Sequence, residues 1–283
     1  MKNTKLLLML VIASSMLVAC SSNITSDTSD SSKNNPKVET KSTSETEEGN
    51  SDSSSKKDSV VDIMNRVAEN SKSTDEIYVT GDVTVGEKGD VKAGIYDLEI
   101  TGGSGNITGD RKKVDLLFIN WVAGAPGSSS DFPSKIRLIL FDGDILHFSN
   151  ISKIKFNAVP TKVQTSNELG IGEYIVGRDI KPGTYKLSTN MNMDPQFDNL
   201  GWEVRIYNDL TRSTKEQRLA PGNLDVAVKL EEGEIISTSF DNTDHDISSD
   251  EARLIFTELN WEVYWILNNK SLIWTSNLFY ILG

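Results

Sequence analysis

The 283-residue chain has few of the residues that build metal sites and nucleophilic active sites, with one cysteine and two histidines. A single cysteine excludes an intramolecular disulfide, and two isolated histidines exclude most zinc sites. Basic residues are the minority as well, because 29 Lys and Arg stand against 41 Asp and Glu, a net charge of −12. Phosphate binding needs a basic surface, so nucleic acid is not expected as a partner.

Long apolar runs are missing except near the N-terminus. There, the thirteen residues Leu6–Val18 follow Lys2 and Lys5 and are apolar apart from two serines. A helix of that length spans about 20 Å, less than the roughly 30 Å hydrocarbon core of a bilayer. Residues 1–19 are therefore predicted to be a signal peptide and not a membrane span.

The apolar stretch ends in Leu17-Val18-Ala19-Cys20, which contains the only cysteine. A leucine three residues before a cysteine and a small residue directly before it resemble the lipobox of bacterial lipoproteins. The resemblance implies diacylglycerol transfer to the Cys20 sulfur, cleavage before Cys20 and acylation of the new amine. Two or three acyl chains give stable anchoring. We therefore expect lipidation at Cys20 and a location on the extracytoplasmic face of the cell membrane; the alternative is an ordinary signal peptide with an incidental cysteine.

The chain after Cys20 changes from a polar linker to a helical pattern. Seventeen of residues 21–58 are Ser or Thr, so 20–58 is predicted to be a disordered linker. Ser59 and Asp62 have the spacing of a capping box, and the apolar residues that follow recur at helical spacing. A short amphipathic helix is predicted over 59–72, docked on the first folded domain.

Internal repetition is the most informative feature. Residues 90–98 match 179–187 in type at most positions, and residues 140–146 match 230–236. The two offsets are 89 and 90 residues, so both motifs keep one spacing. This predicts a duplicated unit, with a first β-domain over 76–160 and a second over 168–260.

Turn residues and alternating patterns predict strands inside each unit. Pro182-Gly183 suits the centre of a type II turn, and Asp142-Gly143 and Glu232-Gly233 suit hairpins. Gly102–Asn106 is predicted to be a flexible hairpin tip and not a phosphate loop, since no G-x-G-x-x-G pattern occurs there. Further strands are predicted over 114–121, 135–141, 145–148, 202–207, 225–230, 234–240 and 252–259. Many short strands indicate an all-β protein, with two tandem β-sandwich-like domains.

Residues 172–185 read GEYIVGRDIKPGTY. This run resembles a G-x-Y-x-V-G-x-D-I-x-P-G-T-Y signature of uncharacterised secreted and lipid-anchored proteins of Gram-positive bacteria. The resemblance covers one strand–turn–strand unit per copy and implies no catalytic residue. The first copy departs from it, with an additional residue in Glu87-Lys88-Gly89, and with Ala93 and Ile95 in place of Pro and Thr.

Few residues suggest a ligand site. Tyr96, Trp121, Tyr185 and Trp202 would be ligand-facing aromatics if they were exposed, although strand positions also suit core packing. In the acidic loop 241–246, a calcium site would use Asn242, Asp244 and Asp246, but the loop does not follow the EF-hand pattern. No catalytic residue, cofactor or metal site is predicted.

The aromatic-rich C-terminal extension 261–283 has no counterpart in the first copy. Three hypotheses stay open for it: extra structure on the second domain, an interfacial membrane or partner segment, or sequence appended by a reading-frame change. For the whole chain, the leading hypothesis is a non-enzymatic cell-surface protein that binds a cell-wall, host-protein or glycan ligand. The alternative is a structural or envelope-maintenance lipoprotein without a soluble ligand, and a carboxylate-based hydrolase is a third hypothesis.

Overall fold

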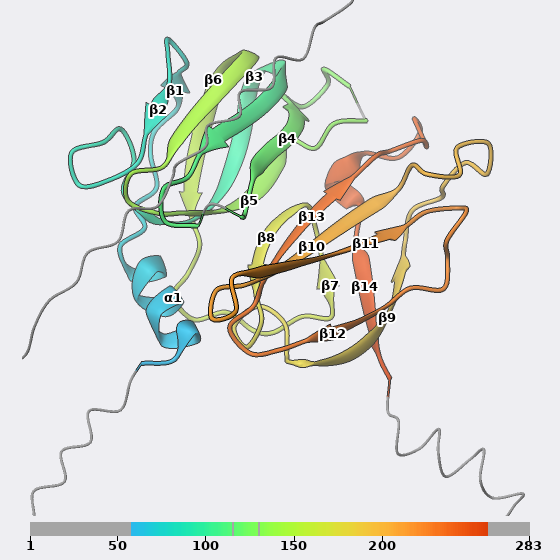
Figure 1. Ribbon diagram of the computed structural model, residues 1–283. Coiled ribbons are helices and arrows are strands. Elements are labelled where there is room, and N and C mark those ends of the chain that lie inside the picture. Colours follow the sequence, from blue (N-terminus) through green and yellow to red (C-terminus); the bar gives the residue numbers. More distant parts are fainter. Residues whose placement is uncertain (1–57, 115, 130, 260–283) are drawn as a thin grey trace, which may run out of the picture. The chain divides into compact units, whose positions relative to one another are not determined.

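The computed structural model describes residues 58–114, 116–129 and 131–259 (Figure 1). The predicted signal peptide, Cys20, the linker up to residue 57 and the extension 261–283 lie outside the described residues. All described residues belong to one compact unit. They form two β-sheets and one short α-helix, which confirms the predicted all-β class.

Helix α1 (Val60–Glu69) begins where the sequence predicts it. The Ser59 hydroxyl accepts a hydrogen bond from the Asp62 N–H at 3.1 Å, and the Asp62 carboxylate accepts one from the Ser59 N–H at 3.2 Å. The capping box is thus confirmed, and it satisfies N–H groups that have no partner within the helix. Met64 and Ala68 are buried in one apolar cluster with side chains of both halves of the chain, not of the first half alone.

The two halves of the described chain contain fourteen strands. The first half has β1 (Ile77–Tyr78), β2 (Val83–Thr84), β3 (Gly94–Asp110), β4 (Ile119–Gly124), β5 (Lys135–Leu140) and β6 (Ile145–Ala158). The second half has β7 (Glu168–Leu169), β8 (Gly172–Ile175), β9 (Gly183–Thr189), β10 (Trp202–Asn208), β11 (Ser213–Leu219), β12 (Ala227–Leu230), β13 (Ile235–Phe240) and β14 (Leu254–Glu258). A 3₁₀ turn over Ser249–Glu251 precedes β14.

The predicted strands are largely confirmed, with two informative exceptions. Of the strand predicted over 114–121, only the last part is found, because β4 begins at Ile119 and the described residues 114 and 116–118 are not in a strand. The sequence did not reveal β11, whose first five side chains are all exposed. An edge strand that is exposed over most of its length has no apolar alternation that would mark it.

The predicted hairpin tip at Gly102–Asn106 is wrong. These residues lie inside the long strand β3, whose register against β6 shifts between Ile100 and Asn106. A side chain at Gly103 or Gly105 would collide with main-chain carbonyl oxygens of β6. The glycines therefore permit the close approach of two irregular strands, as at a β-bulge.

The predicted turn types at the repeated motifs are also wrong. Gly183 does not have the positive φ that a type II turn requires. Instead, the ring of Tyr185 packs over it, and a side chain at this position would lie about 3.0 Å from that ring. Gly143 and Gly233 do take positive φ values, 92° and 86°. However, the strands on either side of each turn do not pair with each other, so neither turn closes a hairpin.

The repeated motifs have matching strand registers in the two halves. Gly94 pairs with Leu140 in the first half, as Gly183 pairs with Leu230 in the second. Leu98 pairs with Phe156, as Leu187 pairs with Phe256.

Side-chain contacts match as well. The Tyr96 hydroxyl donates to the Lys92 carbonyl at 3.0 Å, and the Tyr185 hydroxyl donates to the Lys181 carbonyl at 2.9 Å. Each tyrosine ring meets a phenylalanine ring edge-on, at 5.6 Å in the first half and 5.8 Å in the second.

The halves differ in how their strands are divided. In the first half, β3 pairs with both β5 and β4, and it stays continuous through its bulges. In the second half, two strands in different sheets correspond to β3. Strand β9 pairs with β12, as β3 does with β5, and β10 pairs with β11, as β3 does with β4. In the same way, the long β6 corresponds to the separate strands β13 and β14.

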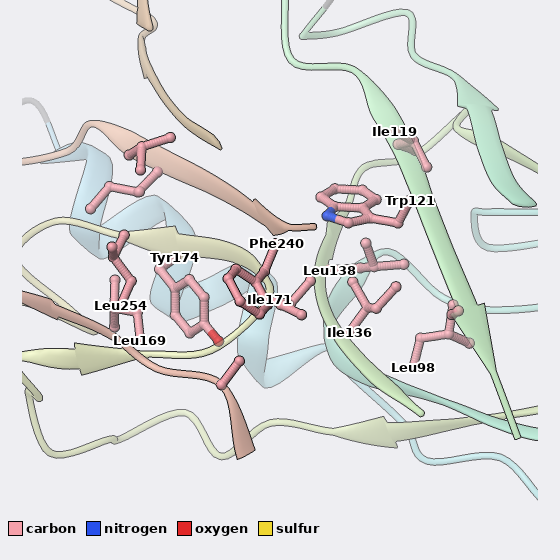
Figure 2. Close-up of a cluster of buried hydrophobic side chains, with 14 of the residues drawn as sticks. Leu98, Ile119, Trp121, Ile136, Leu138, Leu169, Ile171, Tyr174, Phe240 and Leu254 are labelled. Carbon is pink, nitrogen blue, oxygen red and sulfur yellow. The ribbon is translucent and has the colours of Figure 1, made fainter. Parts of the chain in front are cut away.

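One sheet and one core extend through both halves. The larger sheet has the order β1-β6-β3-β5-β8-β13-β10-β11, with β2 on β6 and β4 on β3; the smaller has the order β12-β9-β14-β7. Figure 2 shows the shared core, in which Trp121, Ile136 and Leu138 of the first half lie near Ile171 and Phe240 of the second. The sequence separates the halves between residues 160 and 168, but packing makes them one body.

Candidate binding clefts between the two halves

The two halves meet along a seam of short backbone contacts. Strands β5 and β8 pair in parallel at Arg137 and Gly172, and the Arg137 N–H donates to the Ile171 carbonyl at 3.2 Å. Further along, the indole N–H of Trp121 donates to the Thr238 carbonyl at 3.0 Å. Because the strands touch over so short a length, space is left on both sides of the contact.

Behind the seam lies a buried cluster of charged side chains. The Arg111 guanidinium donates to both carboxylate oxygens of Glu173, at 2.7 and 2.9 Å, and also to the Ile139 carbonyl at 2.8 Å. Arg111 comes from the first half and Glu173 from β8, and their side chains are 2% and 0% exposed. A paired buried charge is strongly destabilising when it loses its partner. This cluster therefore ties the halves together.

Asp144 completes the buried cluster from the turn before β6. Its Oδ2 accepts from the Phe141 N–H at 2.9 Å and lies 3.5 Å from the Arg111 Nε. Burial raises the pKa of Asp144 to about 6, and the nearby charge of Glu173 raises it too. Asp144 Oδ1 and Arg111 Nε have no hydrogen-bond partner within the described chain.

The same turn in the second half holds a similar buried carboxylate. Glu234 is fully buried, and its Oε2 accepts from the Glu231 N–H at 2.8 Å, as Asp144 does from Phe141. Its Oε1 accepts hydrogen bonds from Asn208 Nδ2 at 3.3 Å and from Lys215 Nζ at 3.2 Å. Each half therefore uses one buried carboxylate to hold the glycine turn between two strands.

On one side of the seam lies an open cavity of about 580 Å³, which we call the Arg137 cleft. Its lining includes Asp97, Lys135, Arg137, Glu168, Tyr174 and Asp179. Strands β3 and β5 supply the first three of these residues, and the second half supplies the others. Such a volume falls in the range of small-molecule binding sites in proteins.

Arg137 is the best-fixed side chain of the Arg137 cleft. It pairs directly across the strands with Asp97, with Nε–Oδ1 and Nη2–Oδ2 distances of 2.7 and 3.2 Å. Its guanidinium lies over the ring of Tyr174, 5.3 Å from the centroid, and Nη1 is 3.7 Å from Asp179. Bidentate and stacking contacts together hold an arginine in one geometry.

The charges behind Arg137 are buried and neutralise one another. Asp179 accepts from the Ile175 N–H at 2.8 Å and from Arg178 Nη1 at 2.7 Å. Burial raises the pKa of Asp179 in spite of these partners. Burial also raises the pKa of Tyr174 to about 12, so its hydroxyl stays neutral and accepts from the Gly170 N–H at 3.1 Å. At the rim, by contrast, Lys135 and Glu168 are exposed.

On the other side of the seam lies a second cavity of about 500 Å³, which we call the Trp121 groove. Its lining includes Asn120, Trp121, Val122, Glu203, Arg205 and Phe240. Asn120 and Val122 lie on the exposed face of β4, while Trp121 points inward and is only 5% exposed. Glu203 and Arg205 lie on β10 and form an ion pair at 2.5 Å.

The four aromatic residues predicted to face a ligand are buried in the shared core and form no exposed surface. Tyr96, Tyr185 and Trp202 are buried in the core and are at most 2% exposed, so their faces are not available to a ligand. Their phenol and indole groups bond within the protein, as the indole N–H of Trp202 does to the Thr189 hydroxyl at 2.9 Å. Trp121, which is 5% exposed, lines a cavity, the Trp121 groove.

In the acidic loop 241–246, two of the three side chains considered as calcium ligands accept hydrogen bonds from the loop's own main chain. Asn242 Oδ1 accepts from the Asp244 N–H at 2.9 Å, and Asp244 Oδ1 accepts from the Asp246 N–H at 3.2 Å. In the described part of the chain, no three His, Cys, Asp or Glu side chains are grouped so that they could hold a metal ion. The calcium hypothesis thus has no support in the positions of these side chains.

Sequence reasoning missed the residues that build the seam, although the signature run contains several of them. Gly172 lies against the main chain of Arg137, where a side chain would collide, and its φ is 126°. Tyr174 supports the Arg137 guanidinium, and Asp179 caps the end of β8. The tyrosine and aspartate of the signature thus have structural positions at the Arg137 cleft.

Comparison of the chain with protein-family models, curated proteins and solved structures finds no match in any of the three. Among the described residues, no helix is long and apolar enough to cross a membrane.

Proposed function

We propose that this is a lipid-anchored cell-surface protein that binds its ligand without catalysis, in the Arg137 cleft. The observation that carries the proposal is the rigid placement of Arg137 between Asp97, Asp179 and the Tyr174 ring, at the base of an open cavity of about 580 Å³. Fixed polar groups in a concave site reduce the entropy lost on binding.

The proposed ligand is polar, either a segment of a protein or a glycan. The rim of the Arg137 cleft offers the exposed ammonium group of Lys135 and the exposed carboxylates of Glu168 and Asp250. Gln164, Ser166, Ser249 and Arg253 add further polar side chains to the lining. Such a lining can donate to and accept from a ligand with many hydroxyl or amide groups.

The proposal includes a duplicated origin for the two halves, each shaped as a β-sandwich-like unit. Matching registers, matching tyrosine contacts and a buried carboxylate in the same turn of each half support it. A duplication explains why a binding cleft forms at the seam, since two related bodies meet there edge to edge.

The membrane anchor is tested at Cys20. The full-length protein is expected to enter the membrane fraction of a Gram-positive host and to carry lipid, whereas the Cys20→Ser variant is expected in the soluble fraction. Globomycin, which blocks lipoprotein signal cleavage, should cause the unprocessed wild-type protein to accumulate. If wild type and Cys20→Ser fractionate alike, the anchor is refuted.

Ligand binding is tested with glycan and cell-wall arrays and with whole cells. The double variant Lys135→Ala/Glu168→Ala changes only exposed rim groups, and we expect it to lose at least tenfold in affinity. The matched control Glu69→Ala/Lys88→Ala removes one exposed charge of each sign away from the cleft and should bind as wild type does. Equal binding by both double variants would refute the Arg137 cleft as the binding site. If the wild-type protein binds no ligand at all, the structural, envelope-maintenance role is favoured.

A further inference from the structure

Strand β4 has one unpaired edge, and this edge faces the Trp121 groove. The N–H of Ala125, the residue after β4, donates to the Gly103 carbonyl within β3, while the Gly124 N–H donates away from β3, to the Pro133 carbonyl at 3.0 Å. Main-chain groups alternate sides along a strand. Those of Val122 and Asn120 therefore also point away from β3, and no strand of the described chain pairs with them.

The opposite wall of the groove is the end of β13. The Asp241 N–H donates to the Gly201 carbonyl on the β10 side, so the main-chain groups of Phe240 point to the other side, toward the groove. Strand β8 covers that side only as far as Thr238, which pairs with Gly172. The chain leaves the sheet there, since Gly172 has a positive φ. The Trp121 groove is thus a place where the sheet lacks a strand.

The floor and the rim of the groove differ in chemistry. Trp121, Ile171 and Phe240 are buried beneath it, and Val122, which is 41% exposed, lies beside it. The charged lining consists of the carboxylates of Asp131, Glu203 and Asp241 and the guanidinium of Arg205. Arg218 also borders the rim, 2.7 Å from Glu203 and 3.8 Å from Asp241, so carboxylates outnumber guanidinium groups there by three to two.

We propose that the Trp121 groove binds an extended peptide segment of a partner protein, which adds as a strand along the free edge of β4. Side chains of a strand alternate between faces, so every second residue would contact the apolar floor and the others the acidic rim. The segment that fits therefore alternates apolar with basic residues. Strand addition obtains affinity from main-chain hydrogen bonds and specificity from alternate side chains.

The main-chain edges favour a peptide over a glycan. The Glu203 carboxylate is already engaged by Arg205 and also by Arg218, at 2.7 Å. The free hydrogen-bonding groups of the groove are instead the peptide groups of Asn120 and Val122, which repeat with the spacing of a strand. The Trp121 groove shares one lining residue, Ile171, with the Arg137 cleft, and the inference does not depend on the proposed function.

The proposal is tested by selecting from a phage library of random twelve-residue peptides on the full chain. We expect enrichment of sequences that alternate apolar residues with Lys or Arg. Binding of the synthetic peptide acetyl-Lys-Val-Lys-Val-Lys-amide is then measured by calorimetry, together with a version N-methylated at its valines and one N-methylated at its second and third lysines. Both methylated peptides are expected to bind at least tenfold more weakly, because they cannot donate to one wall of the groove.

Variants of Val122 test the edge of β4 directly. Val122→Pro removes the N–H that faces the groove and leaves the bonds to β3 in place, so we expect at least a tenfold loss of peptide binding with an unchanged melting curve. Val122→Thr keeps the N–H and the branched shape and should bind within twofold of wild type. If Val122→Pro does not fold, the N-methylated peptides still test whether main-chain hydrogen bonds hold the segment.

Three results would overturn the proposal. One is selection without enrichment of the alternating pattern, and another is peptide binding that N-methylation leaves unchanged. The third is a glycan that binds the full chain and is lost in Asn120→Ala, since this would assign the groove to a sugar. The double variant Lys135→Ala/Glu168→Ala at the Arg137 cleft should leave peptide binding unchanged. Its result therefore distinguishes a failure of the peptide proposal from a failure of the proposed function.

Discussion

Asp144→Asn should change how the stability of the fold depends on pH. The side chain of Asp144 is 1% exposed, and burial raises its pKa from 3.8 to about 6. Asn has nearly the same shape and can still accept from the Phe141 N–H, but it carries no charge. The variant thus isolates the cost of ionising one buried carboxyl group.

The sign and size follow from proton linkage. The folded state holds the Asp144 proton more tightly than the unfolded chain does, so the protonated carboxyl group stabilises the fold. This stabilisation is fully present below pH 3.8 and is lost as the pH rises through about 6. A difference of about 2 pKa units corresponds to about 3 kcal/mol at 1.36 kcal/mol per unit. At pH 7 we therefore expect Asp144→Asn to be more stable than wild type by up to about 3 kcal/mol, and near pH 4 the difference should vanish.

Urea denaturation followed by tryptophan fluorescence measures this between pH 4 and 7.5. Only the difference between the two proteins is interpreted, because other buried carboxyl groups, such as Asp179, also titrate. The control is Asp142→Asn, which changes the net charge by the same amount in the same turn. Its side chain is 63% exposed, so the difference from wild type should not change with pH as it does for Asp144→Asn. Should the curves of wild type and Asp144→Asn run parallel over the whole range, the reasoning about the buried cluster is refuted.

Three further predictions concern single contacts, each measured by urea denaturation. Glu173→Ala leaves Arg111 buried without its bidentate partner and should cost about 3–5 kcal/mol; a loss below about 1 kcal/mol would show that the pair does not hold the seam. Gly172→Ala should cost more than about 1 kcal/mol, because its φ is 126° and the added carbon meets the main chain of Arg137; wild-type stability would contradict this. Ser59→Ala removes the helix cap and should cost about 1 kcal/mol, with Ser59→Asp close to wild type; equal losses in both variants would contradict the capping role.

The local elements were predictable because their signals are local. The capping box needs only Ser59 and Asp62, which are three residues apart, and it lies where the sequence indicates. Alternation over a few residues identified most strands with a buried face. It could not identify β11, because every side chain in the exposed part of that strand is free to be polar.

Turn and glycine signals were less decisive, because one residue type serves several purposes. Gly102–Asn106 has the composition of a loop, yet its glycines permit two strands to approach each other closely. Gly183 has the sequence context of a turn, yet its missing side chain accommodates the Tyr185 ring. A sequence shows that a side chain is absent, but not which neighbour occupies the space.

The polar segment before the helix, the helix cap, the all-β class and the repeated motifs all follow from local sequence patterns, and the repeated motifs have matching registers in the two halves. The packing of distant segments, by contrast, gives the halves a common sheet and a common core and leaves two cavities beside their contact. Arg111 and Glu173 are 62 residues apart, and Trp121 and Thr238 are 117 apart. No local pattern specifies such pairs, since their contact depends on how whole strands pair and pack.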